Sequence, residues 1–256
     1  MAGHSKWANI KRQKERVDEK KGKTFTQLSR AIIMAAKHGF PDPAANFQLR
    51  TAIEKAKAAG IPNENIERAI AKGAGTYENN DTMYEEVRYE GYGLGGVAIL
   101  IEALTDNRNR TAADMREAFS KNGGNLGETG CVSWMFDKKG VVLLEGEVNE
   151  DFLLEASVEG GADTYKLFKE EKRAEIFSEV TNLDSIINLL KEKKNIFFEV
   201  ELRWIPNTFM EISDPDQYRL LIKLIDALEA IEDVQNVTAN IEIAEVLVKA
   251  TIALAN

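Results

Sequence analysis

The stretch VVLLEGEVNEDFLLEASVEGG, residues 141–161, opens the part of the sequence that decides the fold, and NIFFEVELRW, residues 195–204, closes it. Between these ends, short apolar runs rich in branched and aromatic residues alternate with longer segments of helical periodicity. The expected elements are, in order, strand 141–144, helix 150–159, strands 163–168 and 174–177, helix 183–193 and strand 197–204. This βαββαβ order is that of the ferredoxin-like fold.

The segments on either side of this stretch predict a second sheet domain. The elements expected before it are strands 84–89 and 97–104 around the glycine-rich turn 90–96, a helix with a capping box at Thr111–Asp114 and an end at 122–124, and a strand at 131–136. Those expected after it are strand 209–212, helix 215–231 and strand 237–243. The expected domains are therefore 76–137 together with 206–244, an inserted domain at 138–205, and a tail at 245–256.

Helical periodicity predicts a bundle in the N-terminal domain, residues 1–75. Its helices are expected at 25–37, 44–59 and 63–72, with Asn63 as the N-cap of the last and a polar side on the first that includes Gln27, Arg30 and Lys37. The arm at 5–23 has few apolar residues, and we expect it to stay mobile until it binds a partner. The predicted fold class is α+β: an N-terminal three-helix bundle followed by two ferredoxin-like α+β domains, one inserted in the other.

Charge is distributed unevenly along the chain. The net charge is −9, yet residues 1–75 carry 15 Lys and Arg against 7 Asp and Glu. Residues 76–256 carry 18 basic and 35 acidic side chains. A polyanion therefore attracts the N-terminal third and repels the rest of the chain, which favours a nucleic-acid ligand bound through its phosphates.

The basic arm is the strongest candidate for a nucleic-acid contact. Its cations can pair with phosphates, and the aromatic ring of Trp7 is suited to base stacking. The alternative is a solvated charged tail that serves solubility. The candidate nucleic-acid-binding residues of the arm and the first two helices are Lys6, Trp7, Lys11, Arg12, Lys14, Arg16, Lys20, Lys21, Lys23, Arg30 and Arg50.

The segment TDNRNRT, residues 105–111, is a second candidate contact. It places Arg108 and Arg110 beside the start of a helix, where unsatisfied N–H groups also attract anions. Pairing of both arginines with local acids is the alternative interpretation.

Other functional classes find less support in the sequence. Residues 91–96 match G-x-G-x-x-G, but a dinucleotide site needs a helix after this pattern, whereas a strand is expected here. With one cysteine, Cys131, and two histidines, His4 and His38, no zinc cluster can be assembled, and neither histidine has a nearby Ser or Cys partner for nucleophilic catalysis. We expect a non-enzymatic protein without metal or cofactor, although an active site assembled from distant residues stays open.

The sequence also predicts a cytoplasmic protein with no membrane partner. Its N-terminus lacks the apolar core of a signal peptide, and no apolar run approaches the roughly 20 residues that a membrane-spanning helix needs. A lone cysteine suits a reducing compartment.

Several blocks of sequence resemble a known family. They are AGHSKWANIK at 2–11, NIERAIAKG at 65–73, YEGYG at 89–93, LTDNRNRT at 104–111, and the stretch from GGNLG at 123–127 to WMF at 134–136. Together they resemble the YebC/PmpR family of transcriptional regulators, which also includes a mitochondrial translational activator of cytochrome c oxidase. The resemblance covers essentially the whole chain and implies three domains, a helical bundle and two α+β domains.

The resemblance implies two activities, regulation of transcription through DNA binding and support of translation on the ribosome, including passage through proline-rich stretches. We take DNA-binding transcriptional regulation as the first hypothesis. A ribosome-associated factor that binds ribosomal RNA is the second, because no base-reading helix is recognisable and folded RNA is commonly recognised by shape and phosphate. A protein-interaction adaptor that uses the acidic domains is the third. The oligomeric state cannot be inferred from the sequence.

Overall fold

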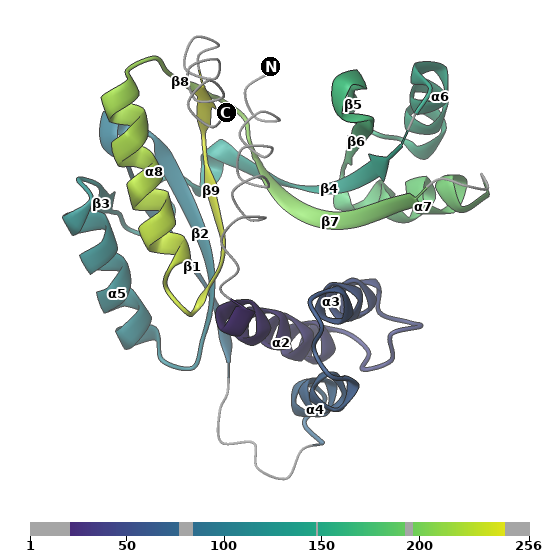
Figure 1. Cartoon of the computed structure of the whole chain (residues 1–256), viewed down its shortest axis with the longest axis horizontal. Helices are drawn as coiled ribbons and strands as arrows, with labels where there is room; N and C mark the ends of the chain where they lie inside the picture. Colours follow the sequence, from purple (N-terminus) through teal and green to yellow (C-terminus); the bar gives the residue numbers. More distant parts are fainter. Residues whose placement is uncertain (1–20, 77–83, 147, 193–196, 244–256) are drawn as a thin grey trace. The chain divides into compact units, whose positions relative to one another are not determined.

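The structure is a computed structural model that describes residues 21–76, 84–146, 148–192 and 197–243. The chain divides into two compact units (Figure 1). Unit 1 comprises residues 1–135 and 208–256, and unit 2 comprises residues 136–207. Unit 2 is thus an insertion in the sequence of unit 1. The expected tail at 245–256 lies outside the described residues.

Helices α2 (Lys21–His38), α3 (Phe47–Ala58) and α4 (Asn63–Gly73) form the helical bundle of unit 1. Their inward faces share a core that includes Ile32, Leu49 and Ala56, each fully buried. The side chain of Asn46 caps α3 by accepting a hydrogen bond from the Leu49 N–H, and its amide donates to the Ala35 carbonyl of α2. Asn46 therefore fixes both the start of α3 and its position against α2.

Strands β1 (Glu85–Tyr92) and β2 (Ala98–Thr105) form the antiparallel hairpin that the sequence predicts. The turn passes through Gly95 and Gly96, whose φ angles of 75° and 81° are unfavourable for a side-chain-bearing residue. The G-x-G-x-x-G match is therefore explained by this turn and by strand pairing, and no helix follows it to receive a pyrophosphate.

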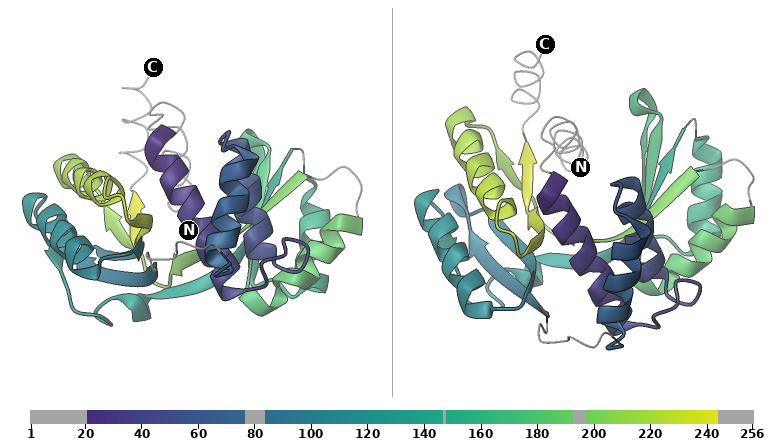
Figure 2. Two further views of the ribbon diagram at one scale, coloured as in Figure 1. Left: turned by 90° about the horizontal axis from the view of Figure 1, so that it is seen from below. Right: turned by 60° about the horizontal axis from the view of Figure 1, so that its bottom comes forward.

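The hairpin is the centre of an antiparallel sheet in unit 1. After helix α5 (Arg108–Lys121), β3 (Asn125–Leu126) pairs with β1; after helix α8 (Pro215–Glu229), β9 (Val234–Ala239) pairs with β2, which gives the order β3-β1-β2-β9. Helices α5 and α8 lie side by side on one face of this sheet (Figures 1 and 2). Phe119 of α5 and Leu224 of α8 belong to the same buried core as Ile99 of β2. Short strands β8 (Met210–Ile212) and β10 (Ile241–Ile243) pair in parallel.

Unit 2 has the βαββαβ order that the sequence predicts. Its elements are β4 (Phe136–Glu145), α6 (Glu150–Gly160), β5 (Thr164–Phe168), β6 (Arg173–Ser178), α7 (Leu183–Glu192) and β7 (Phe197–Pro206). The strand order β5-β6-β4-β7 is the ferredoxin-like arrangement. In unit 1 the order of connections differs, because its sheet starts with a hairpin. The predicted α+β class, helices followed by sheet-containing domains, is confirmed.

Several local predictions were wrong. Helix α5 begins at Arg108 behind Asn107, whose side chain accepts from the Arg110 N–H, so the capping box at Thr111–Asp114 lies inside the helix. Pro62 precedes α4 and Asn63 is already helical. The strand expected at 131–136 is a loop with a 3-10 turn up to Met135. The strand expected at 237–243 is divided into β9 and β10, because Asn240 between them bonds to Ala98 of β2.

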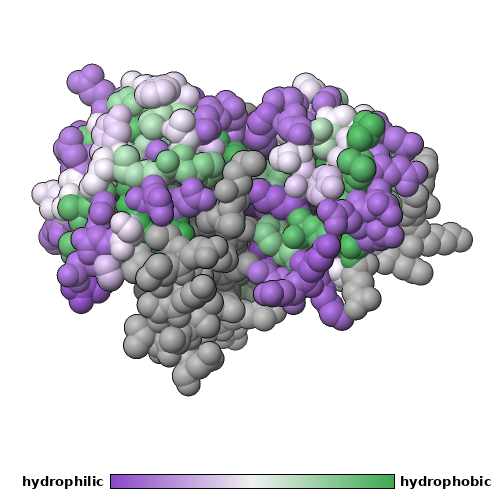
Figure 3. Space-filling view, turned by 90° about the horizontal axis from the view of Figure 1, so that it is seen from above, coloured by the Kyte–Doolittle hydropathy of each residue, from purple (hydrophilic) through white to green (hydrophobic). Residues whose placement is uncertain are grey.

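In the view of Figure 3, hydrophilic and hydrophobic residues are interspersed on the coloured surface. In the part of the chain that the structure describes, no helix is long and apolar enough to cross a bilayer.

Phe119 tests the core of unit 1. We expect Phe119→Ala to lower the free energy of unfolding by about 4 kcal/mol, because the ring is 1% exposed and its removal leaves a cavity between α5 and the sheet. Phe40→Ala is the matched control: this ring is 72% exposed, and its loss should change stability by less than about 0.5 kcal/mol. Equal effects in urea denaturation would contradict the placement of α5.

Candidate nucleic-acid interface

Most of the predicted arm lies outside the described residues. This applies to Lys6, Trp7, Lys11, Arg12, Lys14, Arg16 and Lys20. Lys21 and Lys23 belong to the first turn of α2, so the helix begins four residues before the expected start at residue 25. The first turn of α2 contains no acidic residue. Lys21 and Lys23 therefore continue the basic sequence of the arm into a regular helix.

Further cations lie on helices α3 and α4. Lys55 and Lys57 are in the last turn of α3 and Lys72 is in the last turn of α4, where the helix dipole favours positive charge. Arg50, a predicted contact residue, is half-buried on α3. Arg68 forms an ion pair with Glu64 one turn earlier on α4.

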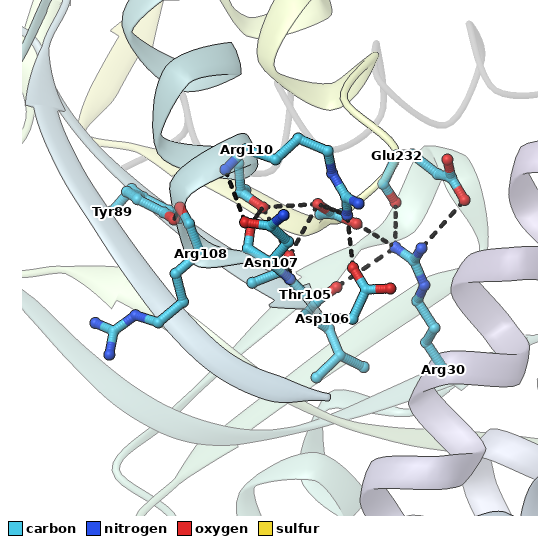
Figure 4. A network of polar contacts seen from close by, with 11 residues as sticks. Arg30, Tyr89, Thr105, Asp106, Asn107, Arg108, Arg110 and Glu232 are labelled. Carbon is cyan, nitrogen blue, oxygen red and sulfur yellow. Dashed lines mark hydrogen bonds and ion pairs between the residues drawn. The ribbon is translucent and has the colours of Figure 1, made fainter. Parts of the chain in front are cut away.

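Arg30 is placed differently from the sequence-based expectation. Its side chain is 7% exposed and points from α2 into a polar network at the edge of the unit 1 sheet (Figure 4). The guanidinium donates to the Asp233 carboxylate at 2.7 Å and to the Glu232 carboxylate at 3.1 Å. It also lies over the Tyr84 ring, 5.2 Å from the centroid. A buried guanidinium that is paired in this way is not available to a phosphate.

Two further residues of the predicted polar side of α2 also face the sheet. Gln27 donates to the Val234 carbonyl, and Lys37 donates to the Tyr84 carbonyl at 3.0 Å. The expectation that this side meets solvent or ligand was based on polarity alone. The acceptors are backbone carbonyls at the starts of two strands: Tyr84 directly precedes β1, and Val234 is the first residue of β9.

Asp233 is the centre of the network. It is 2% exposed, in the loop between α8 and β9. Besides Arg30, it accepts hydrogen bonds from Arg110 at 2.8 Å, Thr111 at 2.7 Å and Thr105 at 3.1 Å. Burial raises the pKa of the Asp233 carboxyl, but the hydrogen bonds and the nearby guanidinium groups outweigh this and hold it below its ordinary value. The carboxylate is therefore ionised at neutral pH and joins α2, β2 and α5.

Arg110 and Arg108 differ in their surroundings, although both were predicted contacts. Arg110 is paired with Asp106 and Asp233, both at 2.8 Å, and these carboxylates raise its pKa. This is the local pairing that the sequence left as the alternative. Arg108 points away from the network (Figure 4), is 67% exposed, and has Glu85 at 3.8 Å. A loose, exposed pair contributes little stability, so Arg108 can exchange its acid for a phosphate.

A second polar centre is the carboxylate of Glu90, which is 2% exposed in β1. It accepts hydrogen bonds of 2.7 to 2.8 Å from the backbone N–H groups of Gly130, Val132 and Ser133. Burial raises the pKa of Glu90, but these backbone hydrogen bonds lower it further than burial raises it, and the net shift is downward. The loop at 127–135 is thus held on the sheet by an ionised carboxylate. Tyr92 adds a hydrogen bond to the Cys131 carbonyl at 2.9 Å.

A groove of about 690 Å³ lies between α5 and the residues around β3. Its lining residues are Arg116, Phe119, Ser120, Gly124, Asn125, Leu126, Gly127 and Glu128. Gly127 lies against the Cys131 sulfur, so the groove ends beside the loop that Glu90 holds. In residues 21–76, 84–146, 148–192 and 197–243, no group of three His, Cys, Asp or Glu side chains could bind a metal ion.

Sequence reasoning missed both buried carboxylates. Asp233 is separated from Arg30 by 203 positions, and Glu90 is separated from its loop partners by 40 to 43. In the sequence each looks like an ordinary surface acid. The sequence predicts residue 90 in the glycine-rich turn 90–96, whereas Glu90 lies in β1, and no pattern in the sequence marks Asp233.

Two protein-family models match the chain. The one described as the TACO1/YebC protein N-terminal domain matches residues 5–76, and the one described as the TACO1/YebC second and third domain matches residues 84–241. A protein of Rippkaea orientalis is 77% identical over 255 residues, covering 99% of this chain and 100% of its own length. A protein of Nostoc sp. is 67% identical over 253 residues, with coverages of 99% and 100%. Both carry the name "Probable transcriptional regulatory protein".

A solved structure is also similar. It is the crystal structure of a conserved hypothetical protein from Aquifex aeolicus, with a TM-score of 0.78 and 44% sequence identity, covering 90% of this chain and 93% of that one.

Replacement of Asp233 tests the ion-pair network. We expect Asp233→Asn to lower the free energy of unfolding by about 3 kcal/mol at neutral pH, because Arg30 stays buried without the closer and more deeply buried of its two carboxylates. The depressed pKa makes this stabilisation fully present above the ordinary value of 3.8 and lost as pH falls through the folded-state pKa. The difference between variant and wild type should therefore shrink in acid. Asp216→Asn, at the exposed pair with Arg219, is the control and should have little effect; similar losses for both would contradict the network.

Cys131 offers a chemical test of the loop. Burial, with the nearby Glu90 carboxylate, raises the pKa of its thiol, so less thiolate is present than in a free cysteine. We expect iodoacetamide at pH 8 to alkylate the folded protein several-fold more slowly than the urea-unfolded chain. Cys131 is the sequence's one cysteine, so the total thiol reaction reports it directly. Equal rates would show that the loop is not held as described.

Proposed function

The chain belongs to the TACO1/YebC family, and on that premise we propose that it is a non-enzymatic, DNA-binding regulator of transcription that binds phosphates with its basic N-terminal third. The two relatives above carry the name "Probable transcriptional regulatory protein". The mode of binding proposed here goes beyond those names.

The charge of the N-terminal third carries the proposal. Residues 1–75 have 15 basic against 7 acidic side chains, whereas the rest of the chain is strongly acidic. A duplex presents one phosphate charge for about every 1.7 Å of its axis, so it attracts this third and repels the remainder. The protein therefore approaches with the arm and bundle first.

The network around Asp233 restricts which cations can take part. Arg30 and Arg110 are paired with carboxylates, and we assign them to the junction between bundle and sheet. The proposed phosphate contacts are Lys6, Lys11, Arg12, Lys14, Arg16, Lys20, Lys21, Lys23, Arg50 and Arg108, with Trp7 as a base contact. These residues bring charge but no array of base-reading side chains, so affinity should be high relative to sequence specificity.

The orientation of α2 favours a second candidate, a ribosome-associated factor that binds structured RNA. Gln27, Arg30 and Lys37 of α2 face the unit 1 sheet, so this side of the helix does not enter a DNA major groove. A protein that offers phosphate contacts without a reading helix is suited to the shape and backbone of folded RNA. Duplex DNA and ribosomal RNA therefore have to be compared directly.

Alanine substitution of Lys11, Arg12, Lys14 and Arg16 together tests the proposal. Each phosphate contact contributes about one unit to the slope of log affinity against log salt concentration. We expect the quadruple variant to lower that slope by up to about 4 units and to bind more weakly at low salt. Fluorescence anisotropy with duplex DNA, and separately with ribosomal RNA, measures both quantities.

The matched control removes the same charge elsewhere, through alanine at the exposed lysines Lys121, Lys169, Lys191 and Lys223. Its slope should equal that of the wild type. A quadruple arm variant with an unchanged slope removes the arm from the interface. Absence of binding to every nucleic acid favours the third hypothesis, an adaptor that recognises protein.

A further inference from the structure

The aromatic side chain of Trp134 is exposed to solvent, and the proposed phosphate contacts give it no role. Its side chain is 70% exposed at the end of the loop 127–135, in the 3-10 turn Ser133–Met135. Its indole N–H donates to the Cys131 carbonyl at 3.1 Å. The polar edge of the ring is therefore already satisfied within the loop. What the ring offers to a ligand is its aromatic surface.

The loop that carries Trp134 is held rigidly. Glu90 binds the backbone N–H groups of Val132 and Ser133, which directly precede the tryptophan, at 2.7 and 2.8 Å. Val132 is fully buried, and the Cys131 carbonyl that holds the indole also accepts the Tyr92 hydroxyl. An aromatic ring fixed in this way loses little conformational entropy when it binds. The conformational entropy of the Trp134 side chain is thus lost during folding and not on binding.

The surroundings of Trp134 favour a nucleobase over a protein partner. Protein hot spots lie in well-packed pockets, surrounded by further contacts that exclude water. The exposed residues of the same loop are Glu128, Thr129 and Gly130, which are polar or small. The other exposed large hydrophobic side chains of the described residues lie on other elements: Phe40, Leu154, Val158, Val180 and Leu220. A base needs one ring face and tolerates polar neighbours.

We propose that Trp134 is a stacking platform for an unstacked nucleobase, in single-stranded or looped nucleic acid; this rests on the proposed nucleic-acid function. Bases inside a duplex are covered by their neighbours on both faces, so a protruding indole selects a base that is not stacked. The contact lies in the sheet domain of unit 1, outside the basic N-terminal third. It would let the protein distinguish single-stranded from double-stranded nucleic acid, which the phosphate contacts of the arm alone do not do.

The groove that ends beside the same loop provides room for a nucleotide of the bound strand. Its volume of about 690 Å³ is within the range of small-molecule sites. Arg116 can pair with a phosphate, and Ser120 and Asn125 can bond to a sugar or base edge. Glu128 lies at the end near Gly127 and disfavours a phosphate there. A phosphate of the bound strand is therefore directed to the α5 side of the groove.

The test compares Trp134→Ala with wild type on a single-stranded RNA of about 12 nucleotides and on a duplex of the same length. We expect the variant to bind the single strand about tenfold more weakly and the duplex unchanged, because stacking contributes only where a base face is free. The salt slope should stay the same, since the ring carries no charge. Trp134→Phe should recover most of the affinity. Leu154→Ala, at another exposed apolar side chain, should match the wild type.

A direct signal comes from the full chain with Trp7→Phe and Trp204→Phe, which leaves Trp134 as its one tryptophan. At concentrations that saturate the binding curve of this variant, single-stranded RNA should quench its emission, and duplex should not.

Unchanged single-strand affinity in Trp134→Ala, an equal loss on duplex, or no quenching overturns this inference while the proposed function stands, provided that duplex or RNA still binds with a steep salt slope. Absence of binding to any probe overturns both.

Discussion

The buried carboxylate of Asp233 is the constraint on which the arrangement of unit 1 depends. The carboxylate accepts hydrogen bonds from Arg30 of α2, Arg110 and Thr111 of α5 and Thr105 of β2. The backbone carbonyl of Asp233 accepts a further hydrogen bond from the Leu104 N–H. An ionised carboxylate at 2% exposure is stable only with such partners, and each partner is fixed in return. Helical bundle, hairpin and α5 are therefore joined by one charge. Removal of any one of these partners deprives the buried Asp233 carboxylate of a hydrogen bond, which destabilises the fold.

This constraint divides the cations of the protein into two groups. Arg30 and Arg110 neutralise acids within the fold, so their contribution is structural. The cations of the arm, with Arg108 at the start of α5, are the ones that we propose for phosphate contacts. Glu90 performs a role like that of Asp233 at the other end of the sheet, where it fixes a loop and presents Trp134. Two buried carboxylates thus stabilise unit 1: Asp233 at the junction with the helical bundle, and Glu90 beneath the loop that carries Trp134.

Residue patterns predicted the elements better than they predicted the polar contacts. The βαββαβ order of unit 2 could be read because each strand and helix has its own period of apolar residues, and the hairpin because Gly95 and Gly96 need positive φ. Helix starts were less certain, since Asn107 and Thr111 can both cap and the structure uses Thr111 to bind Asp233. The polar side of α2 was misjudged because its acceptors, at Tyr84, Val234 and Asp233, are far away in sequence. Charge composition located the candidate interface, and it could not tell a phosphate-binding arginine from one that neutralises a buried acid.

We propose that the cations of the arm make the main phosphate contacts, whereas Arg30 of the bundle stabilises the fold. The most direct measurement is the dissociation constant for duplex DNA and for ribosomal RNA of a chain that begins at residue 21, compared with the full chain at physiological salt. We expect the shortened chain to lose at least about tenfold in affinity for the preferred nucleic acid, with the thermal unfolding midpoint unchanged. Equal dissociation constants for the two chains would contradict it.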